Sequence, residues 1–243
     1  MVRLLTLICV ALLSVQCSSE ASSDIPKAEA LCIVGASFAY PENCWFEMAC
    51  ERLGYKPINK AISGENISGL VQRIKEHKLM TIKELDSFAT LVVMYTHDVD
   101  VYSATGANAQ YAAAFDYLIK SYTIACQSLE YNRHSRYYGI EGGKPVDILV
   151  CTHWHDARKR FNSSVRALDA KWECVRLCEF DKHIGFTAQD YDPATGKHLS
   201  VLYAHPDQNA TEVIDGITYG WHPKRGRDSE IQQRMADIFC KCF

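Results

Sequence analysis

One serine stands where an α/β protein would place a reactive hydroxyl. Residues 31–35 read Leu-Cys-Ile-Val-Gly, an apolar run of strand length that stops at a glycine, and Ser37 follows two positions later. A parallel strand that ends in this way delivers a side chain to the carboxyl edge of its sheet, where ligands and catalytic groups gather. The small residues Gly35 and Ala36 allow a tight turn and the approach of a substrate. The pattern predicts either a nucleophilic Ser37 or a serine that only caps the turn.

Further groups that could do chemistry follow the later apolar runs or precede the last helical segment. They are Gly64, His97, Asp98, Asp215 and His222. Taken alone, each has an ordinary explanation: a glycine in a turn, a helix cap and its neighbour, or a histidine in a surface loop. Because the carboxyl ends of parallel strands meet at one edge of a sheet, we expect these groups to lie near Ser37.

In order and position, these groups resemble the sequence blocks of the SGNH (GDSL-type) hydrolases. That family has a GDS-like motif after its first strand, a glycine after the second and a GxND-like motif after the third. Its last loop carries DxxH, usually followed by proline. The corresponding blocks here are residues 35–38, 59–64, 95–98 and 215–223, and the resemblance extends from about residue 31 to residue 243.

The blocks depart from the family pattern at several positions. Ala36 stands where aspartate is usual, and Tyr95 replaces a glycine. His97 replaces the asparagine that would donate a hydrogen bond to the oxyanion. In the last block Tyr219 stands at the place of the aspartate, so Asp215 is the expected substitute, with an insertion before the histidine.

The resemblance implies a Ser-His-Asp mechanism. Ser37 would be the nucleophile, and His222 would take its proton. A carboxylate should hold the imidazole in the correct tautomer and stabilise its charged form. Asp215 is the first candidate for this role and Asp228 the second. If neither reaches the imidazole, the resemblance leaves a Ser-His dyad steadied by a backbone carbonyl.

The resemblance also implies an oxyanion hole. Its donors would be the backbone N–H groups of Ser37 and Gly64 and the side chain of His97, with Asp98 as a supporting neighbour. A neutral imidazole donates from only one ring nitrogen, so donation from His97 would depend on pH near neutrality. No metal or other cofactor is expected in this mechanism.

A competing site follows the fourth apolar run. Residues 152–156 read Thr-His-Trp-His-Asp, which is similar to the THxHxDH run of metallo-β-lactamase-type hydrolases. His153, His155 and Asp156 would then hold a divalent metal, with the aspartate one position early and the final histidine missing. The alternative is that His153 and Trp154 face the substrate of the serine site.

The elements that must position these groups alternate along the chain. Apolar runs predict five buried strands, at residues 31–35, 55–61, 88–95, 145–151 and 174–178. Helical spacing predicts helices at residues 44–53, 70–79, 108–130, 160–170 and 228–239. This alternation predicts a parallel sheet with helices on both faces, and the resemblance adds a flavodoxin-like three-layer α/β/α fold. Short strands at residues 199–203 and 211–217 predict a β-hairpin insertion near the C-terminus.

The composition and the first residues of the chain limit the class of protein to which it can belong. With 48% hydrophobic and 23% charged residues, the 243-residue chain suits one globular domain, which we place at residues 30–243. The net charge of -3 shows no basic bias, so no nucleic-acid partner is expected. Residues 1–23 have a basic start, a short apolar run and a small polar exit, which predicts an export signal with a tether to about residue 29. Cys17 lies where a bacterial lipoprotein carries its lipid, which would attach the exported protein to a membrane.

Two classes of function remain open at this stage. The first is an exported ester hydrolase, with an acyl or acetyl group on a carbohydrate as one substrate class. The aromatic residues Trp154, Tyr219 and Trp221 motivate the carbohydrate, since such rings stack on sugars as well as packing in cores. The second is a glycan-binding protein that keeps the fold and has lost catalysis, which the replaced asparagine and the stretched last block motivate.

Overall fold

The computed structural model of the chain describes residues 28–76, 78–94, 108–127, 135–137, 140–141, 143–207 and 210–243. The predicted export signal, its tether and Cys17 lie outside these residues. His97 and Asp98 also lie outside them. Within the described part, no helix has both the length and the apolar character needed to cross a membrane.

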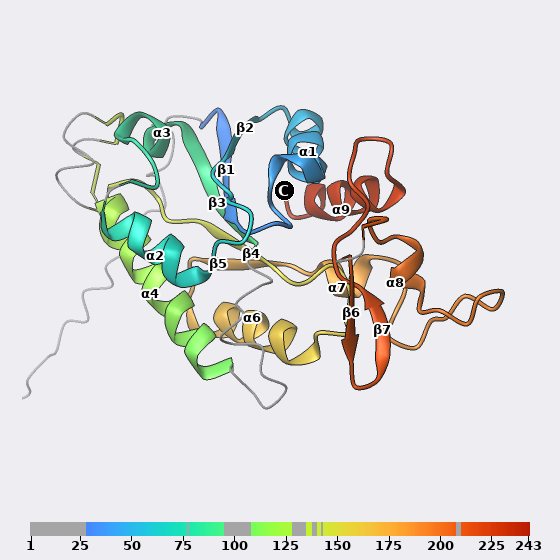
Figure 1. The fold of residues 1–243 in the computed structure, drawn as a ribbon. Coiled ribbons are helices and arrows are strands. Elements are labelled where there is room, and N and C mark those ends of the chain that lie inside the picture. Colours follow the sequence, from blue (N-terminus) through green and yellow to red (C-terminus); the bar gives the residue numbers. More distant parts are fainter. Residues whose placement is uncertain are drawn as a thin grey trace, which may run out of the picture.

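A parallel sheet forms the centre of the fold, as the alternating runs predict (Figure 1). Its strand order is β2-β1-β3-β4-β5, and every neighbouring pair is parallel. The strands are β1 (Ala30–Gly35), β2 (Lys56–Asn59), β3 (Phe88–Met94), β4 (Ile148–Cys151) and β5 (Val175–Cys178). The central strands β1, β3 and β4 are almost wholly buried, which explains why they read as continuous apolar runs rather than alternating ones.

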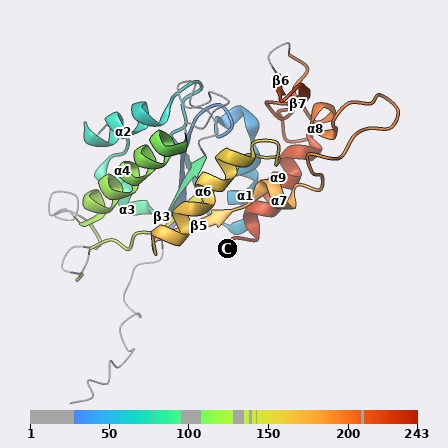
Figure 2. The same cartoon turned by 90° about the horizontal axis from the view of Figure 1, so that it is seen from below.

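Helices cover both faces of the sheet and produce the predicted three layers (Figure 2). One core lies against α2 (Ile67–Lys75), α4 (Asn108–Gln127) and α6 (Lys159–Lys171). The other lies against α1 (Trp45–Leu53) and α9 (Glu230–Cys240). The fold class is therefore confirmed, with helices on both sides of a five-stranded parallel sheet.

Shorter elements refine the prediction near the C-terminus. The hairpin is present, formed by β6 (Thr211–Ile214) and β7 (Ile217–Gly220). The predicted strand at residues 199–203 is wrong, because α8 (Leu199–Leu202) occupies it. The ring nitrogen Nδ1 of His198 accepts from the Ser200 N–H at 3.1 Å and caps this helix. Three further helical elements were not predicted: the 3₁₀ turn η1 (Pro41–Asn43), α3 (Ile82–Ser87) and α7 (Phe180–His183).

An aromatic cluster joins α1, α7 and α9. The Trp45 ring meets Phe180 and Phe239 edge-on, with centroids 5.2 and 5.4 Å apart, and all three rings are buried. Fully burying a side chain of this size stabilises a protein by about 1.5–3 kcal/mol, and edge-to-face pairs add to it. Because Trp45 is the first residue of α1, this cluster fixes the helix directly after the loop that carries Ser37.

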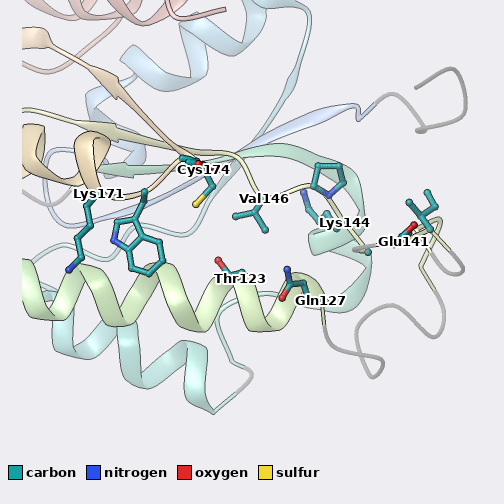
Figure 3. Close-up of a pocket in the computed structure, with 12 residues that line it drawn as sticks. Thr123, Gln127, Glu141, Lys144, Val146, Lys171 and Cys174 are labelled. Atoms are coloured by element: carbon teal, nitrogen blue, oxygen red, sulfur yellow. The ribbon is translucent and has the colours of Figure 1, made fainter. Parts of the chain in front are cut away.

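A pocket of about 670 Å³ lies at the opposite end of the sheet from Ser37. Figure 3 shows its lining, with Thr123 on α4, and Lys144 and Cys174 just before β4 and β5. The Lys144 ammonium donates to the Phe88 carbonyl at 2.8 Å, and burial lowers the pKa of this lysine. Since its lining precedes the strands rather than following them, the pocket does not belong to the predicted site.

The end of β1 approaches β3 so closely that only glycine fits at Gly35. A Cβ at this position would lie 2.4 Å from the Met94 carbonyl oxygen and 2.8 Å from the Ala39 Cβ. Neither atom is the far end of a flexible chain, so the backbone itself would have to move.

We therefore expect Gly35→Ala to lower the free energy of unfolding by about 3 kcal/mol, as overpacking does in a rigid core. Gly54→Ala is the matched control. Gly54 has a φ of 75° with no atom near its added Cβ, so the cost should be only about 1 kcal/mol of backbone strain. Urea unfolding of both variants measures the difference, and equal losses would contradict the close approach.

Candidate active site

The loop after β1 presents Ser37 at the carboxyl edge of the sheet. Its backbone is held by side chains on both sides of the serine. The Trp45 indole donates to the Phe38 carbonyl at 2.9 Å, and the Asn43 amide donates to the Ser37 carbonyl. The Ala39 N–H closes a turn onto the Ala36 carbonyl at 3.1 Å. Ser37 is therefore half-exposed on a loop whose other residues are fixed by the core.

His222 reaches this loop from the far end of the chain. The Ser37 hydroxyl and the His222 Nε2 are 2.8 Å apart, across 185 positions of sequence. The imidazole stacks on the buried Phe38 ring, with centroids 5.0 Å apart and an 18° interplanar angle. The sequence prediction that these two side chains share one edge of the sheet agrees with this geometry.

The segment after β7 holds His222 in place through its backbone. The Trp154 indole donates to the Trp221 carbonyl at 2.8 Å, and the His205 N–H donates to the His222 carbonyl at 2.8 Å. Further along, the Gln232 amide on α9 donates to the Lys224 carbonyl at 3.1 Å.

One pair of amides connects the serine loop and the histidine loop. The Gln232 Nε2 lies 3.4 Å from the Asn43 Oδ1, while Asn43 itself holds the Ser37 carbonyl. Both side chains are buried. Sequence reasoning missed this pair, because an isolated asparagine and an isolated glutamine carry no motif.

The tautomer of His222 follows from a second contact. The Trp221 indole N–H lies 3.1 Å from the same Nε2 that faces Ser37. An indole nitrogen can only donate, so Nε2 must accept and the ring proton lies on Nδ1. This neutral tautomer is the one that can take a proton from the serine hydroxyl.

The Gly64 loop docks beside the serine loop at the same edge. The Ile62 N–H donates to the Gly35 carbonyl at 3.0 Å. Asn59 joins the two loops, since its amide donates to the Ala39 carbonyl at 2.8 Å and its oxygen accepts from the Ala61 N–H at 3.0 Å. Within the described part of the chain, the N–H groups of Ser37 and Gly64 have no hydrogen-bond acceptor. Both remain available as donors, and the third expected donor, His97, lies outside the described residues.

The structure does not bring Asp215 to His222. Asp215 and Gly216 form the two-residue turn between β6 and β7, with φ angles of 52° and 82°. Such a turn needs left-handed backbone at both positions, which Asp-Gly provides. The exposed Asp215 is thus separated from His222 along the chain by the four residues of β7, about 13 Å of extended strand. Its expected role as the orienting carboxylate is not supported, and the exposed Asp228 lies beyond the loop as well.

The histidines of the competing block are buried rather than open to substrate. His153 and Trp154 are 0% exposed, so the expectation that they face the substrate is wrong. His155 bonds the Gly220 carbonyl through Nε2 at 2.7 Å and accepts from the Ala157 N–H at 3.3 Å. The block therefore packs the hairpin onto the end of β4.

The same burial keeps both imidazoles neutral. It lowers the pKa of His155 to about 3 and that of His153 well below its ordinary value. Asn162 fixes the loop around them, because its oxygen accepts from the His153 N–H at 2.9 Å and its amide donates to the His155 carbonyl at 3.2 Å.

A metal at this block would not use the predicted ligands. Among the described residues, the atoms that come within 4.8 Å of one another belong to His153, His155 and Glu212, so Asp156 is not part of the group. The Glu212 carboxylate already accepts two hydrogen bonds from the Arg158 guanidinium. Both ring nitrogens of His155 are also hydrogen-bonded. Of the atoms in this group that could bind a metal, only the His153 Nε2 has no partner in the described part. The arrangement fits a hydrogen-bonded core better than a preformed metal centre.

Comparisons with known proteins agree with the architecture. A family model described as a domain of unknown function (DUF5040) matches residues 29–243. A search of curated proteins finds no match to this sequence. Among solved structures, the chain is similar to a protein described as lipolytic, of the G-D-S-L family, from Desulfitobacterium hafniense DCB-2. The identity is 10%, the TM-score is 0.51, and the match covers 88% of this chain and 99% of that one.

Two further structures have lower TM-scores. TesA is 17% identical, with a TM-score of 0.46 and coverage of 86% of this chain and 94% of that one. A G-D-S-L family protein from Veillonella parvula DSM 2008 is 12% identical, with a TM-score of 0.44 and coverage of 88% and 97%. The match to the Desulfitobacterium hafniense protein, at 10% identity, is a likeness of fold, and that fold is the one of the SGNH (GDSL-type) hydrolases.

The buried neutral histidines predict a measurable acid sensitivity. A histidine whose pKa is lowered by folding binds a proton in the unfolded chain but not in the folded one. Its contribution to stability is therefore complete above about pH 6.5 and is lost as the pH falls. We expect His153→Gln to remove one such proton, which reduces the slope of unfolding free energy against pH by about 1.4 kcal/mol per pH unit between pH 4.5 and 6.

Urea unfolding across this range, with and without the substitution, measures the two slopes. Above pH 7.5 the imidazole is neutral in both states, so the difference between the two proteins should be constant there. Parallel slopes at every pH would contradict a neutral buried His153.

Proposed function

The chain belongs to the family described as a domain of unknown function (DUF5040), and we propose that it is a serine hydrolase that cleaves esters with Ser37 and His222. The observation that carries the proposal is the 2.8 Å contact between the serine hydroxyl and the imidazole Nε2. The tautomer required by the Trp221 contact and the fold shared with G-D-S-L family proteins support it.

The proposed reaction begins with transfer of the Ser37 hydroxyl proton to the His222 Nε2. The serine oxygen attacks the ester carbonyl carbon, and the carbonyl oxygen takes up negative charge. The N–H groups of Ser37 and Gly64 donate to that oxygen, together with His97 if its side chain faces the site. His222 then gives the proton to the departing alkoxide, and the alcohol leaves an acyl-enzyme. A water molecule, activated by the same imidazole, releases the acid and restores the serine.

We propose that the Ser37–His222 pair works without Asp215. The support is the position of Asp215 at an exposed hairpin turn, with β7 between it and the imidazole. Stacking on Phe38 and the hydrogen bonds of the surrounding backbone orient the ring.

A small ester is the substrate class that we propose first. The carbohydrate class loses part of its motivation, because Trp154 and Tyr219 are buried and cannot stack on a sugar. Trp221 is the half-exposed ring of the three. An acetylated carbohydrate therefore remains a substrate to test after simple esters.

Covalent labelling tests the proposal. A fluorophosphonate probe should label the unsubstituted protein, and hydrolysis of p-nitrophenyl acetate should follow the same pH dependence. Ser37→Ala should abolish labelling, and His222→Ala should slow it by on the order of a thousandfold or more, because the serine then lacks its base.

Asp215→Asn is the matched control, since Asn-Gly forms the same turn without the charge. Labelling that persists in Asp215→Asn supports a pair that works without this carboxylate, whereas its loss would restore Asp215 as the orienting group. No labelling at any pH would favour the glycan-binding alternative, and activity that survives Ser37→Ala but is removed by a chelator would favour a metal-dependent hydrolase.

We also propose that the chain is exported and carries a lipid on Cys17. The basic start, the apolar run and the small residues that follow support this proposal. Expressed in full in a bacterial host, the protein should incorporate labelled palmitate and sediment with membranes. Cys17→Ser should lose the label and become soluble, and an unlabelled, uncleaved chain in the cytoplasm would contradict both export and lipidation.

A further inference from the structure

Two hydrogen-bond donors converge on one ring nitrogen at the centre of the site. The His222 Nε2 faces the Ser37 hydroxyl at 2.8 Å and the Trp221 indole N–H at 3.1 Å. A neutral imidazole has a single lone pair on that nitrogen, so the two donors share it. The serine hydroxyl can give its proton away, but the indole cannot. The two contacts therefore have opposite consequences for the base.

We propose that Trp221 is a positioning residue that selects the neutral tautomer of His222 and at the same time opposes protonation of its Nε2. The hydrogen-bond argument depends only on the geometry, whereas its catalytic consequence rests on the proposed function. Trp221 thus performs one task that a carboxylate performs in a triad and counteracts the other.

The hydrogen bond from Trp221 opposes protonation of the His222 Nε2 because it requires the lone pair of that nitrogen. When Nε2 receives the Ser37 proton, it becomes an N–H donor and can no longer accept from the indole. The indole N–H must then turn away or face another donor. A hydrogen bond made only to the neutral form disfavours the charged form. A carboxylate on Nδ1 would select the same tautomer but favour the charged form.

The surroundings of Trp221 hold the indole in this position. The backbone carbonyl of Trp221 accepts from the Trp154 indole, and the backbone N–H of Trp221 donates to the Ala210 carbonyl. The Arg158 guanidinium lies over the ring, 4.2 Å from its centroid. Arg158 in turn forms an ion pair with Glu212, with side-chain exposures of 8% and 12%. The indole is therefore packed between a buried ion pair and the catalytic imidazole.

Among the described residues, one buried ion pair packs against the Trp221 ring. Arg158 brings a positive charge to the far face of the indole, and its partner Glu212 has a pKa raised to about 7 by burial, against the pull of Arg158. When Glu212 is protonated, Arg158 disfavours a charged imidazole more strongly. The neutral His153 lies behind Phe38. On the adjoining loops, His205 contacts Asp207 and Arg225 pairs with Glu42.

The titration of His222 tests this restraint without any turnover. In the Ser37→Ala background, the imidazole signals can be followed by NMR and assigned with His222→Gln. Trp221→Phe keeps a ring under Arg158 and removes only the N–H donor. We expect the pKa of His222 to rise by roughly half to one pH unit in this variant. The ¹⁵N shifts of the neutral ring should also lose their preference for the Nδ1–H tautomer.

Trp172→Phe is the matched control. It removes an indole N–H at the end of α6 that donates to Asp116 on α4, far from the site. It should leave the His222 titration unchanged. An unchanged or lower pKa in Trp221→Phe would overturn the proposal, as would an unchanged tautomer.

The pH profile of labelling adds the catalytic consequence. If Ser37 reacts with a fluorophosphonate, the rate requires neutral His222, so the midpoint of the profile should move to higher pH in Trp221→Phe by the same amount as the pKa. A lower rate without a shift of the midpoint would indicate a merely structural role. If the protein does not label at all, the proposed function fails while the NMR titration still decides on Trp221.

Discussion

The site depends on one hydrogen bond, between Ser37 and His222, that is too weak to create its own geometry. A bond of this kind contributes about 0.5–1.5 kcal/mol net, whereas ordering a single residue costs a similar amount of conformational entropy. The 185 positions between the two side chains must therefore be folded by other forces. The sheet and its helices therefore create the contact between Ser37 and His222. The distance between the two side chains depends on how firmly each loop is held.

The scaffold holds the two loops by burying their polar backbone groups against ordered side chains. Trp45 donates to the serine loop and Trp154 donates to the histidine loop, each from within an apolar core. A buried carbonyl without a partner would cost about 1–3 kcal/mol, so each indole both fills space and fixes one loop conformation. Asn43 and Gln232 then connect the loops directly. The packing of α1 against α9 therefore helps to set the distance between the Ser37 hydroxyl and the His222 imidazole.

The sheet and the approach of Ser37 to His222 were predictable from the sequence, and the remainder of the site was not. Buried parallel strands leave continuous apolar runs, and their carboxyl ends share an edge, so Ser37 and His222 could be placed without coordinates. The capping box of Thr81 and Glu84 is a sequence signal for α3 that apolar periodicity does not detect. By contrast, the short helix α8 depends on a cap by His198, which has no sequence signature. The position of Asp215 was not predictable, because an Asp-Gly pair fits a hairpin turn as well as a catalytic block.

Burial decides the electrostatic character of this edge of the sheet. His153 and His155 are kept neutral by desolvation, and the Arg158 charge is paired with Glu212, whose pKa burial raises to about 7. In the proposed acyl transfer the His222 imidazole becomes charged, and the Trp221 N–H, which bonds only the neutral form, opposes that charge. A substrate that displaces the indole from Nε2 would remove a donor from the neutral form and leave the lone pair to the serine alone. Binding of such a substrate would therefore raise the basicity of His222. The same Nε2 accepts from Trp221 in this structure and takes the proton of Ser37 in the proposed reaction.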